Sequence, residues 1–331
     1  MKTGLKKPQL VLDYNGIDER RYAQEDVIRV DCPFCDSNDF SLLATERRVI
    51  GVVRCNTCGL IYVNPRLKSP EKVYWGDESG YYEEAKLVFC GLKPHHRDKN
   101  YADDLGVIKK FKPRGNFLDI GTNAGFFLRL AKKNKEWNLF GVEPSLSLAQ
   151  LARKYFSLNI INSFLEEATL ENDFFDIVTM TDVFEHVPNP MVILGKVHKI
   201  IKADGILFIK VPNGLFNITK LHLTKLTRQL GEYDIFDSYE HLVHYSHNTL
   251  AKMLAKGGFK VIFKGIGRPI QTPVWQKYTG KYYQYPSPFI LDYKNQILRN
   301  VFYFTGAAEY FLFGCRAGYL APNITVVAQK V

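Results

Sequence analysis

The sequence predicts an α/β protein in which a small cysteine-containing module precedes a doubly wound, mostly parallel sheet of seven strands. Two observations support this prediction: short apolar runs alternate with helical patterns from about residue 100 onward, and two Cys-x-x-Cys pairs lie before them. The 331 residues are 46% hydrophobic and 24% charged, which excludes a disordered chain, a collagen and a disulfide-stapled miniprotein. This length allows one large domain and a smaller one.

The first element is the module at residues 28–68, which follows an N-terminal lead of residues 1–27. Its pairs are Cys32-Pro33-Phe34-Cys35 and Cys55-Asn56-Thr57-Cys58, with 19 residues between them. Two such turns direct four thiolates at one tetrahedral ion, which is typical of structural zinc and leaves no open position for catalysis. Strand-like runs at residues 40–43, 49–53 and 60–63 make this a zinc ribbon; two unrelated Cys-x-x-Cys turns are the alternative.

A connecting segment, residues 69–100, leads to the main domain at residues 101–331. Helices are expected at residues 101–111, 126–133, 146–156 and 190–201, and strands at residues 116–120, 138–142, 159–161, 175–180, 205–211, 259–264 and 324–328. Such alternation indicates a parallel sheet with helices on both faces. An insertion at about residues 268–322 carries apolar residues at helical spacing, among them Phe304, Phe311 and Leu312, and we expect this helix to pack on the core or on a second subunit.

Ligands of such sheets bind at the carboxyl ends of the strands. The first strand ends in Asp119-x-Gly121-x-x-x-Gly125, where glycines let the chain approach a ligand, and the second ends in Glu143, which can accept hydrogen bonds from two ribose hydroxyls. A dinucleotide would favour Gly-x-Gly-x-x-Gly, which this loop lacks. S-adenosylmethionine has the ribose and an ammonium group for Asp119 to face, but no phosphate, so the pattern favours this cofactor.

Residues 116–211 resemble a class I S-adenosylmethionine-dependent methyltransferase, which has a Rossmann-like fold. The resemblance rests on Phe117–Phe127, Gly141–Pro144, Phe175–Val178 and Thr181–Val187. It implies that the cofactor contacts the following residues: Asp119, Gly121, Asn123, Gly125, Glu143 and Asp182. The family usually has glycine where Asn123 stands; asparagine is the next most tolerant residue of left-handed geometry, so the turn is expected to survive.

The stretch Cys58–Arg66, joined to this core, resembles the zinc-containing methyltransferases of sugar and natural-product pathways. Some of these enzymes methylate a carbon of nucleotide-linked keto sugars, and in them an acid–histidine pair beyond the fifth strand lies at the substrate. The stretch Tyr239–Ser246 contains Glu240-His241 at a comparable place. The further C-terminal domain of those sugar enzymes has no counterpart after the seventh strand, so the resemblance leaves the acceptor open.

Methyl transfer to a carbon beside a ketone, or to a sugar hydroxyl, requires a base, and histidine suits this role near neutral pH. His241, beside Glu240, is the first candidate, and His186 is the second. Tyr82 and Tyr239 are the candidates for hydrogen bonds to an oxygen of the acceptor.

Each histidine also has a structural alternative. Glu185-His186 opens a helix, where the acid can cap free amides while the histidine only packs. We expect His244 to be solvated or to cap the helix that begins near Ser246. The pair His95-His96 is expected at the surface.

The formal charge of +10 favours an anionic partner. The first hypothesis is a small sugar-type acceptor, a nucleotide-linked sugar or glycan precursor, methylated at carbon or oxygen. The alternative is an O-methyltransferase that acts on another small molecule or a lipid-linked substrate, and a lower alternative is an RNA methyltransferase. RNA is disfavoured because Thr181-Asp182-Val183-Phe184 replaces the Asn/Asp-Pro-Pro-aromatic tetrad of base-amino methyltransferases, and because no long basic run is interleaved with aromatic residues.

No stretch of the sequence has the length and apolarity of a membrane span. Arg299 and Glu309 bracket only nine uncharged residues, whereas a spanning helix needs about 20. The N-terminus lacks the apolar core of a signal peptide, so a cytoplasmic protein is expected, in which paired cysteines bind metal rather than form disulfides. The apolar helix of the insertion leaves peripheral membrane contact open, and the oligomeric state is also left open.

Overall fold

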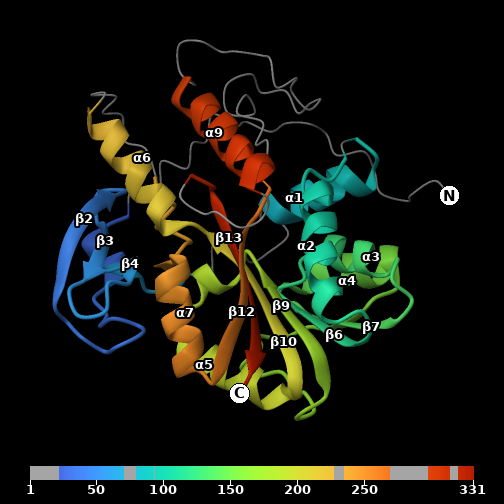
Figure 1. The fold of residues 1–331 in the computed structure, drawn as a ribbon. Helices are drawn as coiled ribbons and strands as arrows, with labels where there is room; N and C mark the ends of the chain where they lie inside the picture. The colour runs from blue at the N-terminus through green and yellow to red at the C-terminus, as the bar shows by residue number, and fades with distance from the viewer. Residues whose placement is uncertain (1–21, 71–79, 93, 227–234, 269–296, 314–319) are drawn as a thin grey trace.

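A computed structural model describes residues 22–70, 80–92, 94–226, 235–268, 297–313 and 320–331, and these form a seven-stranded sheet with a smaller sheet beside it (Figure 1). The strand order of the large sheet is β12-β13-β10-β9-β6-β7-β8. Its strands are β6 (Gly115–Ile120), β7 (Trp137–Val142), β8 (Asn159–Ile161), β9 (Phe175–Thr181), β10 (Ile201–Pro212), β12 (Phe259–Ile266) and β13 (Asn323–Lys330). Pairing is parallel from β8 to β10, and β13 is antiparallel to both β10 and β12. The predicted mostly parallel seven-stranded sheet is therefore confirmed.

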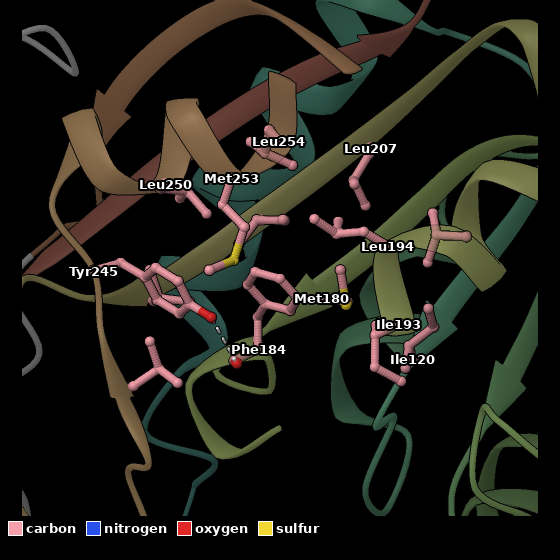
Figure 2. Packing of buried hydrophobic residues seen from close by; sticks show 14 of the residues in the cluster. Ile120, Met180, Phe184, Ile193, Leu194, Leu207, Tyr245, Leu250, Met253 and Leu254 are labelled. Carbon is pink, nitrogen blue, oxygen red and sulfur yellow. Dashed lines mark hydrogen bonds between the residues drawn. The ribbon is translucent and has the colours of Figure 1, made fainter. Parts of the chain in front are cut away.

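Helices cover both faces of this sheet, because alternate residues of each strand point to opposite sides. The helices are α1 (Gly80–Phe89), α2 (Asp98–Phe111), α3 (Phe126–Ala131), α4 (Leu146–Phe156), α5 (Pro190–Ile200), α6 (Gly214–Leu226), α7 (His247–Lys256) and α9 (Ile297–Phe313). In β10, Ile206 and Phe208 join the cluster of α2, α3 and α4, whereas Leu207 and Ile209 join that of α5 and α7. Figure 2 shows this second cluster, in which Leu207 faces residues of α5 and α7.

The cysteine module (residues 28–68) forms the smaller sheet, and the main domain supplies one of its strands. The module contributes β2 (Phe40–Glu46), β3 (Ile50–Cys55) and β4 (Ile61–Val63), which pair antiparallel. The short strand β11 (Val243–His244) pairs with the free edge of β4, and β1 (Val27–Ile28) pairs with β5 (Arg66–Leu67). The segment that carries the predicted acid–histidine pair therefore enters the sheet of the module.

The insertion contains the predicted helix, α9, and three of its apolar residues do not pack on the core of this chain, so of the two expected positions only packing on a second subunit stays a prediction for them. Phe304, Phe311 and Leu312 are 45%, 69% and 76% exposed, whereas Glu309 is buried. The carboxylate of Glu309 accepts a hydrogen bond from the backbone N–H of Leu320 at 2.8 Å, which fixes the inward face of the helix. None of the described helices is long and apolar enough to cross a bilayer.

Candidate functional site

A cavity of ≈ 950 Å³ lies at the carboxyl ends of β6, β7 and β9. Two groups of predicted residues line it, one at the strand ends and one beyond them: Asp119, Gly121, Asn123, Glu143 and Asp182, and His186, Glu240 and His241. Side chains that the sequence associates with a cofactor and with an acceptor are thus brought together in one cavity.

The turn after β6 has the left-handed geometry that the glycine pattern predicts. Gly121 has φ 70° and Gly125 has φ 82°. A Cβ on Gly121 would lie 2.5 Å from a methyl carbon of Val183, so the close approach also requires glycine there. Asn123 adopts φ 53° and retains the turn, as expected. Gly125 is not among the residues that line the cavity; a Cβ there would meet Leu158 at 2.7 Å, so it serves the packing of the turn.

Glu143 is buried and each of its carboxylate oxygens accepts one backbone N–H. Oε2 accepts from Asn123 at 2.7 Å and Oε1 from Ser145 at 2.9 Å. Burial raises the pKa of Glu143 to about 7. Each ionised oxygen can accept a second hydrogen bond, so the carboxylate fits the two hydroxyls of a ribose.

Asp119 is the second buried acid at the strand ends. Its Oδ1 accepts a hydrogen bond from Thr179 Oγ1 at 2.6 Å, and burial raises its pKa to about 7. The carboxyl lines the cavity and has capacity to accept a further hydrogen bond. An ammonium group in the cavity would therefore find an acceptor there and would favour the ionised form of Asp119.

Asp182 forms an ion pair with Arg97, which lies directly before α2 and also lines the cavity. No sequence signal singled out Arg97. Beside it, His95 was expected at the surface, and this expectation is wrong: its side chain is 7% exposed, lines the cavity and stacks on Phe126 with ring centroids 4.2 Å apart. A hydrogen bond of 2.9 Å between His95 Nδ1 and Asp98 holds the ring in this position.

The part of the cavity beyond the strand ends contains two imidazoles from distant segments. The ring centroids of His186 and His241 are 4.8 Å apart. His186 donates its Nδ1–H to the backbone oxygen of Glu240 at 2.9 Å, which joins the two segments. Burial, and then the neighbouring His241, lowers the pKa of His186 to about 3, and burial lowers that of His241 to about 4. Both rings are therefore neutral at pH 7, and the same burial makes each a weaker base than a free imidazole.

Two buried carboxyls accompany these rings. Burial raises the pKa of Glu240 to about 7 and that of Glu185 to about 8. Neither oxygen of Glu185 has a hydrogen-bond partner within the described part of the chain, and one lies 3.8 Å from His186 Nε2. Glu185 therefore does not cap the helix through its side chain. The ligand atoms of Glu185, His186 and His241 also lie within 4.8 Å of one another, so their types and spacing are compatible with a metal ion.

The structure places Tyr82 and His244 in other surroundings than the sequence predicts. Tyr82 packs against the hydrophobic cluster that includes Ala85 and Phe126 and is not among the residues that line the cavity, whereas its neighbour Tyr81 is. Consecutive helix residues point about 100° apart, which accounts for the different surroundings of the two tyrosines. The expectation that His244 is solvated or caps a helix is wrong: it is 2% exposed, and its ring packs edge-on against Phe236.

The four cysteines of the module come together at one point. The Sγ atoms of Cys32 and Cys58 are 3.5 Å apart, as are those of Cys35 and Cys55, and all four lie within 4.8 Å of one another. Four sulfurs around zinc at about 2.3 Å stand roughly 3.8 Å from each other. The cluster is compatible with that ion.

Comparison with known proteins shows the family of this chain. The methyltransferase-domain family matches residues 94–263, which contain both sides of the cavity. The chain belongs to the class I S-adenosylmethionine-dependent methyltransferases. S-adenosylmethionine is the cofactor of this family. The fold of the family and the acids that the sequence predicts at the strand ends are both present in this chain.

The names of the relatives of this methyltransferase describe different reactions. Carboxy-S-adenosyl-L-methionine synthase of Campylobacter jejuni is 31% identical over 214 residues, 59% of this chain and 90% of that protein. Ubiquinone biosynthesis O-methyltransferase of Actinobacillus pleuropneumoniae is 25% identical over 149 residues, 42% of this chain and 59% of that protein. A chain in the complex of the Haloferax volcanii Trm112 methyltransferase activator with a methyltransferase has a TM-score of 0.51 at 15% identity, with 75% of this chain and 97% of that chain covered. This last likeness concerns the fold alone.

Proposed function

We propose that this methyltransferase transfers a methyl group to a small sugar-type acceptor, a nucleotide-linked sugar or glycan precursor, at carbon or oxygen. The observation that carries the proposal is the pair of neutral imidazoles, 4.8 Å apart, in the same cavity as the strand-end acids. Ligand pockets commonly measure about 300–1,000 Å³, and ≈ 950 Å³ lies at the upper end of that range, which suits a cofactor together with a small acceptor.

The strand-end residues would hold the cofactor. Glu143 accepts the ribose hydroxyls on the lone pairs that Asn123 and Ser145 leave, and Asp119 faces the ammonium group. The Gly121 turn lets the backbone approach the bound molecule. When bound, the cofactor supplies a methyl group already activated on a sulfonium. The protein then has to align the acceptor atom and remove its proton.

His241 is the proposed general base. Its ring is neutral at pH 7, and the nearest oxygen of Glu240 lies 3.9 Å from its Nε2, close enough to stabilise the imidazolium that proton transfer creates. His186, held by the backbone of Glu240, is the second candidate for the same proton. Both rings face the cavity that contains the cofactor residues, so one position in the cavity can serve the methyl donor and the base.

The charges of the cavity favour a particular orientation of such an acceptor. Glu185 and Glu240 lie at the reacting end and suit the hydroxyl groups of a sugar, which donate hydrogen bonds to carboxylates. Phosphate groups would be repelled there. Arg97, which is paired with Asp182, and Lys220, which donates to the backbone oxygen of Ile235, line the same cavity and are proposed to attract the anionic part of a nucleotide-linked sugar.

The cysteine module is proposed to bind one structural zinc ion through its four thiolates. The support is the convergence of Cys32, Cys35, Cys55 and Cys58 from two turns that the strands of the module hold together. A shell of four sulfurs has no position for substrate, so the ion would act on the fold rather than on the reaction.

The direct test uses the protein with methyl-labelled S-adenosylmethionine and a panel of acceptors: nucleotide-linked keto and hydroxy sugars, free sugars and bulk RNA. We expect label on the sugar ring of at least one nucleotide-linked compound, with its position found by mass spectrometry. Label on RNA alone, or no label on any sugar while another acceptor is methylated, would refute the sugar assignment. His241→Ala in the same assay separates catalysed transfer from background.

A second candidate is O-methylation of a lipid-linked acceptor. The observation that favours it is the exposure of Phe304, Phe311 and Leu312 on α9, which would suit contact with a lipid surface. The same panel tests it when a polyprenyl-linked glycan in vesicles is added. Transfer to that substrate, with none to soluble nucleotide sugars, would select this candidate.

A further inference from the structure

The turn that carries Glu240 and His241 is held from two sides. On the side of the main domain, the backbone N–H of Leu242 donates to the backbone oxygen of Glu185 at 2.8 Å. On the side of the cysteine module, Leu242 accepts from the backbone N–H of Val63 at 3.0 Å, and β11 then pairs with β4. The active-site turn is therefore a junction between the module and the main domain.

One buried side chain of the module reaches the start of this turn. Glu46, the last residue of β2, is 5% exposed. Its Oε1 accepts the backbone N–H of Phe236 at 2.8 Å, and its Oε2 accepts that of Ser238 at 2.9 Å. A single carboxylate thus binds two amides that flank Asp237.

Asp237 connects this carboxylate to the acid–histidine pair. Its backbone oxygen accepts the N–H groups of Glu240 at 3.0 Å and of His241 at 2.9 Å. Its own φ is 51°, a conformation that a residue with a side chain rarely adopts unless its surroundings hold it. The two bonds from Glu46 fix the peptides on both sides of this residue and so determine where the turn ends.

Further contacts of the module support the same turn. The guanidinium of Arg47 lies 3.6 Å from the ring centroid of Tyr239, and Phe236 is fully buried against Val52 and Ile61 of the module. A buried carboxylate is strongly destabilising without donors, and hydrogen bonds to a charged acceptor are stronger than neutral ones. The hydrogen bonds between the Glu46 carboxylate and the backbone N–H groups of Phe236 and Ser238 therefore stabilise the observed conformation of the turn.

We propose that Glu46 is a positioning residue for the acceptor end of the active site, because it fixes the turn at residues 236–241 so that Glu240 and His241 line the cavity. The catalytic meaning of this position rests on the proposed role of His241 as the base. The position itself can be measured without an acceptor. On this account the cysteine module is a structural part of the active site.

The test compares Glu46→Gln with wild-type protein and with Glu25→Gln, a matched control at an exposed acid before β1. Gln keeps the size of the side chain but presents an amide N–H group to one of the two backbone donors. We expect the zinc content and the affinity for S-adenosylmethionine to be unchanged. Amide hydrogen exchange at residues 236–242 should rise about tenfold. The NMR signals of the labelled His241 ring should shift at pH 7, where the thiolates can retain zinc, as the turn moves and the ring gains water.

Two outcomes would overturn the proposal. One is unchanged exchange at residues 236–242 with unchanged NMR signals of the His241 ring at pH 7. The other is loss of zinc with faster exchange throughout the module, which would make Glu46 a residue of the module's own fold. Glu46→Asp should recover part of the wild-type exchange, since it retains the carboxylate. If His241→Ala leaves methyl transfer intact while Glu46→Gln still frees the turn, the proposed base is wrong and the positioning role stands.

Discussion

Cofactor affinity should depend more on Glu143 than on any other single side chain. Glu143→Ala removes the carboxylate that would accept both ribose hydroxyls, and it leaves the N–H groups of Asn123 and Ser145 without their acceptor. A hydrogen bond to a charged group contributes roughly 1.5–3 kcal/mol. With partial replacement by water, we expect a loss of about 3 kcal/mol, which is on the order of 100-fold in Kd.

Calorimetric titration with S-adenosylmethionine measures this loss. Glu136→Gln is the matched control, because this exposed acid precedes β7 whereas Glu143 follows it. Burial raises the pKa of Glu143 to about 7, so the wild-type affinity should fall as the pH drops through that value and the carboxylate is protonated. Glu143→Gln should show a weaker dependence, and the part that remains is expected from Asp119, whose pKa burial also raises to about 7. A Kd for Glu143→Ala within about threefold of wild type would refute the ribose-binding role.

Three further predictions concern the base, the buried acid and the metal. His241→Ala should lower methyl transfer by about 100-fold or more with cofactor affinity kept; full activity in the labelled-cofactor assay would place the base elsewhere. Burial raises the pKa of Glu185 from 4.5 to about 8, so between these pH values the folded protein retains a proton that the unfolded chain releases. The contribution of Glu185 to the free energy of unfolding is therefore fully present below pH 4.5 and is lost as the pH rises through about 8. In urea denaturation, the free energy of unfolding of Glu185→Gln should decline less than that of the wild type over this pH range, because only the contributions of the other buried acids remain; an equal decline in both proteins would contradict the prediction. A strong chelator should release one zinc per chain and melt the cysteine module, with hydrogen exchange rising at β11 while the large sheet stays protected; protein that contains no zinc as purified would rule out the site.

The helices and strands were predictable where local periodicity decides the structure. Helix α4 and strand β8 have the predicted bounds, residues 146–156 and 159–161. In α4 the apolar residues recur at helical spacing, whereas β8 is a short run that contains two consecutive isoleucines, which favours a strand. The positions of Asp119 and Glu143 also followed, since parallel strands bring their carboxyl ends to one edge of the sheet.

The acceptor side was predictable only in part. The stretch from Glu240 to His244 drew attention through its residue types, but the sequence could not tell that His241 faces the cavity while His244 is buried against Phe236. Two neighbouring segments decide between these positions. The turn anchored by Glu46 directs one histidine into the cavity, and the pairing of β11 with β4 turns the other into the interior.

The sequence by itself determined the order of helices and strands, the four-cysteine module and the acids at the strand ends. These depend on short spacings along the chain, where apolar period and turn chemistry act directly. Only the tertiary structure decided that Arg97 and His95 line the cavity, that Tyr81 rather than Tyr82 faces it, and that Glu46 supports the active-site turn. Such contacts join residues far apart in sequence, and they form because buried charges and amides must find partners wherever the folded chain brings them together.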